Sequence, residues 1–317
     1  MNYFEVKAIS NSALNALDPE MGGSPAKFKK YMDGVYESKE SLSLERGSLL
    51  HSWLEHQDNF IVADLDKPTG QMGAYVESYY KNLIAGYDSV SASEIAYAEV
   101  GFKRDKIETV LKKFTEPENA EYFHFLEEAT GKNVLTKATK EILEACKQSI
   151  QNNKIAWELI CKPWPHKEKE LYWCDNLELQ RKVKIDHLTI DNNKGIIWLT
   201  DYKTTSKSAY NFKDTLDYWR YYRQLEYYKE AILSVDSHTY FVEDDIKDYT
   251  VICNIIVCET FGDFNTVVYN INQSYLDKGR EELDSLLQRA KWHIDNDIWN
   301  QSKEEYPQGY ISLSFTK

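Results

Sequence analysis

The chain has 317 residues, of which 42% are hydrophobic and 14% are aromatic, and its formal net charge is −13. This composition excludes a disordered chain, and no apolar run approaches the roughly 18 residues that a transmembrane helix needs. The negative charge argues against nonspecific coating of nucleic acid, because phosphate contacts need local positive charge. The net charge is still compatible with a basic channel on an otherwise acidic protein.

The start of the chain and the cysteines predict a reduced, cytosolic protein. The opening residues, MNYFEVKAIS, have neither the basic region nor the apolar stretch of a signal peptide. The five cysteines are odd in number and scattered, which is typical of buried thiols in a reducing compartment.

The spacing of apolar residues predicts helices over most of residues 1–155. Ser10 and Ser24, the second followed by proline, are each placed to cap a short helix. Thr136 is placed to cap a longer helix that ends near Asn152. The other stretches with helical spacing are 47–55, 72–84, 90–114 and 117–128.

Three segments rich in β-branched and aromatic residues come next and predict an antiparallel meander. They are residues 168–176, 179–190 and 195–203, and turn-forming residues separate them. Further elements are expected as helices from about 209 and over 218–233, strands near 249–258 and 265–271, and a helix over 273–298.

This order of elements predicts one α/β domain over residues 1–317. Residues 156–317 would form the core, a central mixed β-sheet flanked by helices. Residues 1–155 would form a helical N-terminal elaboration that carries His51.

Two carboxylates and a lysine lie on two of the predicted strands. Asp186 follows an apolar residue, and Asp201 and Lys203 follow the apolar run Ile196 to Leu199. Because side chains alternate along a strand, Asp201 and Lys203 face the same side, and the hairpin brings Asp186 near them. Such oxygen ligands suit Mg²⁺ or Mn²⁺, and the lysine suits an attacking water. The alternative is a surface Asp-x-Lys pair on an exposed strand.

Two helical segments offer further site residues. His51 and Glu55 are one turn apart, and each is either a site residue or part of an ordinary helix surface. Gln224 and Tyr228 are also four apart, so an amide and a phenol project from one face. The alternative for the second segment is a tyrosine-rich helix that simply packs on the sheet.

These motifs, in this order, resemble the PD-(D/E)XK nuclease superfamily, its RecB-type branch and most closely the RecE-like exonucleases of phages and prophages. The matching residues are Gly47 to His51, Asp186, Asp201 to Lys203, and Gln224 to Tyr228. The likeness extends to Ile9–Ser12, Ser24-Pro25, the helix from Thr136 to Asn152, and Trp299 with Tyr306-Pro307, so it covers nearly the whole chain.

The resemblance implies a restriction-endonuclease-like core and a Mg²⁺- or Mn²⁺-dependent deoxyribonuclease. His51, Asp186 and Asp201 would be metal ligands, Lys203 would orient the water, and Gln224 and Tyr228 would support the site. RecE-like members degrade linear duplex DNA from the 5′ end, often as ring-shaped oligomers with a single-strand-annealing partner. A role in recombination and a cytoplasmic location, in a bacterium or a phage-infected host, would follow.

The chain departs from the family pattern at three points. Ile185 stands where the superfamily name implies proline, and Asp201 stands in place of glutamate. No cysteine follows Cys258, so we expect no iron–sulfur cluster of the kind that some relatives carry.

A path for DNA would need positively charged side chains near the motifs. The candidate basic residues are Lys27, Lys29, Lys30, Arg181, Lys182, Lys184, Lys207, Arg220 and Arg223. Two other functions stay open: an endonuclease of the same superfamily, and a non-catalytic module that binds DNA ends.

Overall fold

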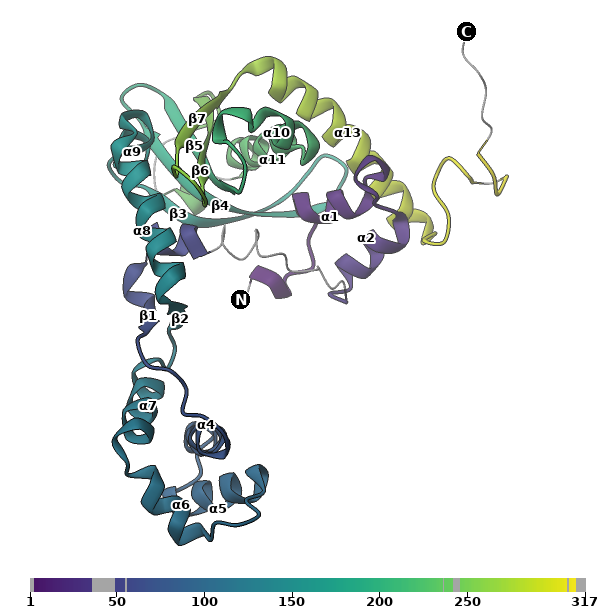
Figure 1. The fold of residues 1–317 in the computed structure, drawn as a ribbon. Helices are drawn as coiled ribbons and strands as arrows, with labels where there is room; N and C mark the ends of the chain where they lie inside the picture. Colours follow the sequence, from purple (N-terminus) through teal and green to yellow (C-terminus); the bar gives the residue numbers. More distant parts are fainter. Residues whose placement is uncertain are drawn as a thin grey trace. The chain divides into compact units, whose positions relative to one another are not determined.

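The computed structural model describes residues 3–35, 49–54, 56–235, 237–241, 246–306 and 308–311. The chain divides into two compact units (Figure 1). The first joins Met1–His51 to Cys146–Lys317, and the second is Ser52–Ala145. These limits differ from the expected division at residue 155, and a single nuclease domain over 1–317 stays a prediction.

A five-stranded mixed sheet forms the centre of the first unit. Its order is β3-β4-β5-β6-β7. The first three strands form the predicted antiparallel meander, β6 pairs parallel with β5, and β7 closes the edge antiparallel to β6. The strands are β3 (His166–Cys174), β4 (Gln180–Asp191), β5 (Ile196–Thr205), β6 (Thr250–Glu259) and β7 (Thr266–Ile271). With the helices around it, this sheet confirms the predicted fold class.

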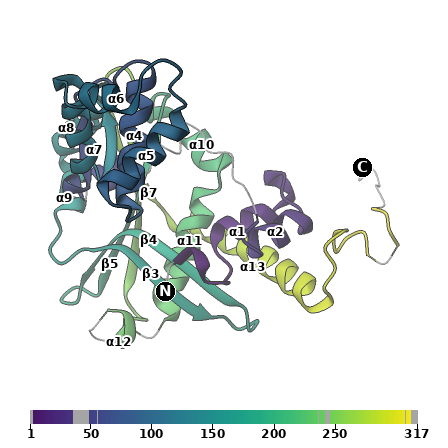
Figure 2. The ribbon, with the colours of Figure 1, turned by 90° about the horizontal axis from the view of Figure 1, so that it is seen from below.

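Helices cover the sheet and join its strands. Since β5 and β6 are parallel, the chain must cross over between them, and α10 and α11 form that crossover. Helix α11 lies against β3, β4 and β5, and α13 lies against α11 (Figures 1 and 2). The helices are α1 (Asn11–Leu17), α2 (Pro25–Met32), α9 (Lys154–Ile160), α10 (Lys213–Tyr218), α11 (Tyr221–Ser234), α12 (Ser237–Tyr240) and α13 (Gln273–Asn296).

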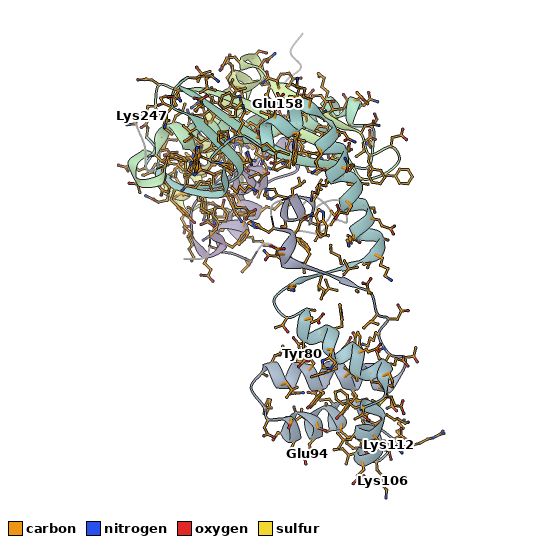
Figure 3. The ribbon with its side chains drawn as sticks, turned by 90° about the vertical axis from the view of Figure 1, so that its left-hand side faces the viewer. Tyr80, Glu94, Lys106, Lys112, Glu158 and Lys247 are labelled. Carbon is orange, nitrogen blue, oxygen red and sulfur yellow. The ribbon has the colours of Figure 1, made fainter. Side chains whose placement is uncertain are left out.

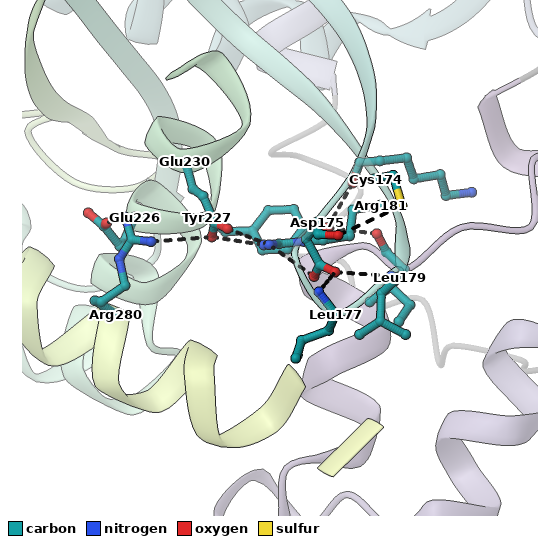
Figure 4. Close-up of polar contacts among 11 residues, drawn as sticks. Cys174, Asp175, Leu177, Leu179, Arg181, Glu226, Tyr227, Glu230 and Arg280 are labelled. Atoms are coloured by element: carbon teal, nitrogen blue, oxygen red, sulfur yellow. Dashed lines mark hydrogen bonds and ion pairs between the residues drawn. The ribbon is translucent and has the colours of Figure 1, made fainter. Parts of the chain in front are cut away.

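A bidentate ion pair made by the buried Arg181 fixes α11 to the β3–β4 hairpin (Figure 4). The two terminal nitrogens of the Arg181 guanidinium on β4 donate to the two carboxylate oxygens of Glu230, at 2.6 and 3.0 Å. The guanidinium also lies over the rings of Trp173 and Tyr227, at 4.7 and 4.4 Å. Leaving any of these charges without its partner would be costly in a core, so α11 has little freedom to shift.

The N-terminal segment ties into the same helix. Tyr227 donates through its hydroxyl to the carbonyl of Ile9 at 2.6 Å, and Ile9 forms a parallel bridge with Arg181. Next along the chain, the predicted caps are confirmed: Ser10 accepts from Ala13 N, and Ser24 accepts from Lys27 N, both at 3.2 Å. These hydroxyls satisfy backbone N–H groups that the first helical turns leave without a partner.

The second unit has its own small aromatic core. Tyr75, Ala96 and Val110 are fully buried in it, and Tyr79 and Phe114 pack against them. Charged side chains such as Glu94 and Lys112 are exposed on its helices (Figure 3). Its elements are β1 (Phe60–Ala63), α4 (Gln71–Ile84), α5 (Ser89–Val100), α6 (Ile107–Phe114), α7 (Pro117–Glu128), β2 (Asn133–Thr136) and the start of α8 (Lys137–Asn152).

Two features of this unit differ from the sequence-based expectation. The helical stretch over 90–114 is two helices, because Gly101 takes a left-handed conformation and ends α5. The parallel pair β1–β2 was not expected, since four-residue strands carry too short a pattern to detect. Thr136 does cap α8 as predicted, accepting from Thr139 N at 3.1 Å. Within the described residues, no helix is long and apolar enough to cross a membrane.

The contact between α11 and α13 gives a first prediction. A methyl group added at Gly279 would lie 3.0 Å from Tyr222 O and 3.1 Å from Arg223 Cα. Valine there should lower the free energy of unfolding by about 2 kcal/mol or more, because backbone atoms cannot give way as side chains do. Urea denaturation measures this.

A valine at exposed Glu281 on the same helix is the control for helix propensity. Equal losses at the two positions would show that the close approach at Gly279 does not limit stability.

Candidate active site

Asp186 and Asp201 lie where β4 and β5 separate. The last pair between these strands is His187 with Thr200, and the next residues in this register are the two aspartates. Beyond that point β4 continues beside β3 and β5 continues beside β6. Tyr202 N donates to Asp186 Oδ2 at 3.4 Å, which holds this carboxylate against β5.

Lys203 joins this pair of carboxylates. Asp201 is 2% exposed, and its Oδ2 forms an ion pair with Lys203 Nζ. The two side chains therefore share one side of β5, as strand alternation predicted. The ammonium also lies 4.7 Å from the centre of the Tyr221 ring, a favourable cation–π contact.

Helix α11 supplies the fourth and fifth members of the cluster. Gln224 Nε2 donates to Asp201 Oδ1 at 3.2 Å and to the hydroxyl oxygen of Tyr228 at 2.5 Å. One helical turn separates these residues, so they present one polar face to the sheet, while Leu225 and Tyr227 are buried in the apolar core. Five of the six predicted site residues thus lie together: Asp186, Asp201, Lys203, Gln224 and Tyr228.

The electrostatics of this cluster favour an added cation. Burial raises the pKa of Asp186, and burial together with the Asp186 charge raises the pKa of Asp201 to about 7, against the opposing effect of Lys203. Burial lowers the pKa of Lys203, but Asp201 and Asp186 more than offset this, so its net shift is upward. Burial raises the pKa of Tyr228 strongly, so its hydroxyl stays protonated. Two carboxylates that resist ionisation near one ammonium fit a divalent metal ion, which would stabilise both as anions.

His51 lies in the same unit, beside β3. Its Nδ1 is 3.2 Å from Oε1 of Glu168, and its ring is 5.4 Å from that of Tyr202. Gly47 and Glu55, the neighbouring residues of its predicted motif, lie outside the described residues. Within those residues, no three His, Cys, Asp or Glu side chains are arranged to hold a metal ion. The metal-ligand roles of His51, Asp186 and Asp201 stay predictions.

A sequence profile of the family described as "PDDEXK-like domain of unknown function (DUF3799)" matches residues 10–306. The chain belongs to this family. The expected membership of the PD-(D/E)XK nuclease superfamily is therefore confirmed, and it supports a nuclease. No curated protein matches the sequence.

A solved structure agrees in fold with this assignment. It is a crystal structure from Eubacterium rectale, described as a putative exonuclease, with a TM-score of 0.52 and 12% sequence identity. The match covers 98% of this chain and 91% of that one. At this identity the likeness shows the fold alone.

This member of the PDDEXK-like family holds a residue near its site that sequence reasoning missed. Glu168 on β3 contacts His51 Nδ1 and forms an ion pair with Lys184, and its charge adds to the raised pKa of Asp186. In the sequence it belongs to the run Lys167-Glu168-Lys169-Glu170, which resembles a solvated strand face. Only the pairing of β3 with β4 reveals its place.

Three basic residues that were candidates for DNA contact are buried instead. Arg223 is 1% exposed and donates to Asp18 Oδ2 at 2.6 Å, so it joins α11 to the end of α1. Arg181 is paired with Glu230, and Lys182 donates to the carbonyls of Tyr3 and Val6 at 2.9 and 2.7 Å. Their positive charges are bonded to groups within the protein and are not available to DNA. A sequence pattern cannot reveal such burial.

Other basic residues that were candidates for DNA contact are at least partly exposed. Arg220 is partly exposed and is paired with Glu20, and Lys184 is paired with Glu168. Lys207, just beyond β5, is exposed. A DNA path would have to use residues of this kind.

The raised pKa of Asp201 gives a second prediction. Its folded-state pKa of about 7 lies above the ordinary 3.8, so its contribution to stability is present below about pH 4 and is lost as pH rises through 7. Asparagine does not titrate. The free energy of unfolding of metal-free Asp201→Asn should therefore rise relative to wild type between these pH values, by on the order of 4 kcal/mol.

Urea denaturation at several pH values in the presence of a chelator measures this difference. Asp263→Asn, at an exposed turn, is the matched control for the change from aspartate to asparagine. A difference between Asp201→Asn and wild type that stays flat across this pH range would contradict the raised pKa.

Proposed function

We propose that this protein is a Mg²⁺- or Mn²⁺-dependent DNA exonuclease. The observation that carries the proposal is a cluster where β4 and β5 separate. It joins the buried Asp201 to the partly buried Asp186 and Lys203, and Gln224 of α11 donates to Asp201. Mg²⁺ is commonly bound through one or two carboxylates and several waters, so two aspartates suffice for such a site.

The residues of the cluster have distinct parts in phosphodiester hydrolysis. Asp186 and Asp201 would hold the metal ion, with His51 as a further ligand. When bound, that ion supplies a Lewis acid and lowers the pKa of a water to make it a nucleophile. The Lys203 ammonium offsets negative charge that develops on the phosphoryl oxygens. Gln224 holds Asp201 in orientation, and the protonated Tyr228 hydroxyl accepts from Gln224 in turn.

The finer proposal is a RecE-like enzyme that degrades linear duplex DNA from the 5′ end during recombination. Motifs in the RecE-like order along nearly the whole chain support it, as does the fold shared with a protein described as a putative exonuclease. A ring-shaped homo-oligomer, a single-strand-annealing partner and a cytoplasmic location, in a bacterium or a phage-infected host, belong to the same proposal.

Digestion of end-labelled linear duplex DNA with Mg²⁺ or Mn²⁺ tests the function. Wild-type protein should shorten the DNA progressively from its ends, and Lys203→Ala should lower the rate at least a hundredfold, because the transition-state charge loses its counterion. The position of the label that is released first reports the polarity.

Lys194→Ala, in the exposed turn at the far end of the β4–β5 hairpin, is the matched control and should cut like wild type. Covalently closed circular DNA separates the alternatives, because an exonuclease needs an end. Cleavage of the circle would favour an endonuclease. Binding of DNA ends without any cleavage in either metal would favour a non-catalytic module.

A further inference from the structure

Glu168 has an unusual backbone for a residue within a strand. Its φ angle is +50°, in the left-handed region that glycine and asparagine tolerate better than glutamate. The β3–β4 register pairs Lys167 with His187 and Lys169 with Ile185, so Glu168 stands opposite Asp186. Strained backbone of this kind gathers at functional sites, where the side chain it presents has a use.

Both carboxylate oxygens of Glu168 already have partners. Oε1 lies 3.2 Å from His51 Nδ1, and Oε2 forms an ion pair with Lys184 Nζ. The carboxylate is therefore committed to two neighbours and is poorly placed to become a metal ligand itself. Lys184 fixes its charge and orientation, and the other oxygen faces the imidazole.

The partner at Nδ1 decides which nitrogen of His51 carries the proton. A carboxylate beside Nδ1 accepts a hydrogen bond from an N–H there, and the neutral ring then keeps its lone pair on Nε2. Metal-ligating histidines are commonly held this way by a carboxylate that does not touch the metal.

We propose that Glu168 is a positioning residue that holds His51 in the Nδ1-protonated tautomer, ready to bind the metal ion through Nε2. This role rests on the proposed metal-dependent function. In this relay, Lys184 orients Glu168 and Glu168 orients His51. Lys184 would therefore serve the site in this way, in place of the DNA contact expected for it. It also accounts for a glutamate where the backbone favours glycine.

The first test observes the tautomer directly and needs no metal. Long-range ¹H–¹⁵N correlation spectra of histidine-labelled, metal-free protein at pH 8 should show His51 with its proton on Nδ1, assigned by the signal that His51→Gln removes. Glu168→Gly should shift this signal toward the Nε2-protonated form. An unchanged tautomer in Glu168→Gly would overturn the proposal.

The second test measures Mn²⁺ affinity by calorimetry. Glu168→Gly should bind Mn²⁺ about 10–100-fold more weakly, the usual cost of losing such a partner. Its melting temperature should be equal to or above that of wild type, because glycine relieves the left-handed strain. Glu168→Gln keeps an acceptor oxygen and should stay within about threefold of wild type.

Two further variants separate positioning from general packing. Combining His51→Ala with Glu168→Gly should weaken Mn²⁺ binding no more than His51→Ala alone, because both changes remove the same contribution, that of His51 as a metal ligand. Glu170→Ala, on the same strand with its carboxylate bound to the Tyr172 hydroxyl at 2.8 Å, is the matched control and should bind normally. The relay would be refuted if the two changes weakened Mn²⁺ binding additively in the double variant. It would also be refuted if Glu170→Ala weakened Mn²⁺ binding as much as Glu168→Gly does.

These readouts also separate this inference from the proposed function. Wild-type protein that binds no Mn²⁺ would refute the metal-dependent function and, with it, the ligand role of His51. Wild-type protein that binds Mn²⁺ and cuts DNA, with no change in Glu168→Gly, would refute only the role of Glu168.

Discussion

Burial of two like charges side by side is the constraint on which the site depends. Asp186 and Asp201 lie in the low-dielectric interior of the sheet, where ionisation of one opposes ionisation of the other. A single ammonium, Lys203, partly offsets this, and the amide of Gln224 adds one hydrogen bond. An arrangement of charges that is poorly balanced alone would become balanced if a divalent cation bound there, as we propose. Such a site would give up some stability for function.

The position of α11 follows from a second set of charges, farther from the reaction. Arg181 and Arg223 hold the helix to β4 and to the end of α1, through Glu230 and Asp18. Both arginines are fully buried, so loss of the partner of either would leave a buried charge without compensation. Gln224 is adjacent to one of these anchors along the helix, and its amide therefore reaches Asp201 from a fixed direction. The arginines serve the site by holding its scaffold.

Much of this could be predicted from the sequence, because its signals are local. Strand alternation places Asp201 and Lys203 on one side, and helical spacing places Gln224 beside Tyr228. The meander and its turns predict that Asp186 approaches them. Glu168, in contrast, could not be found, because its neighbours in sequence are alternating charges and its importance lies in a register across strands. The burial of these three residues could not be predicted for the same reason, because their partners lie far away in the sequence. They are Arg181, Lys182 and Arg223.

The crossover between β5 and β6 sets how this chain can tolerate changes in length. Each residue of an α-helix turns the next side chain by about 100°. One residue inserted between Gln224 and Tyr228 would move the phenol off the shared face, and with Arg223 kept in place it would also turn Glu230 away from Arg181. The same insertion in the exposed segment 206–208, between β5 and the start of the crossover, would be absorbed by loop backbone. Natural variation in length should therefore collect before the crossover helices and spare the turn of α11 that faces the carboxylates.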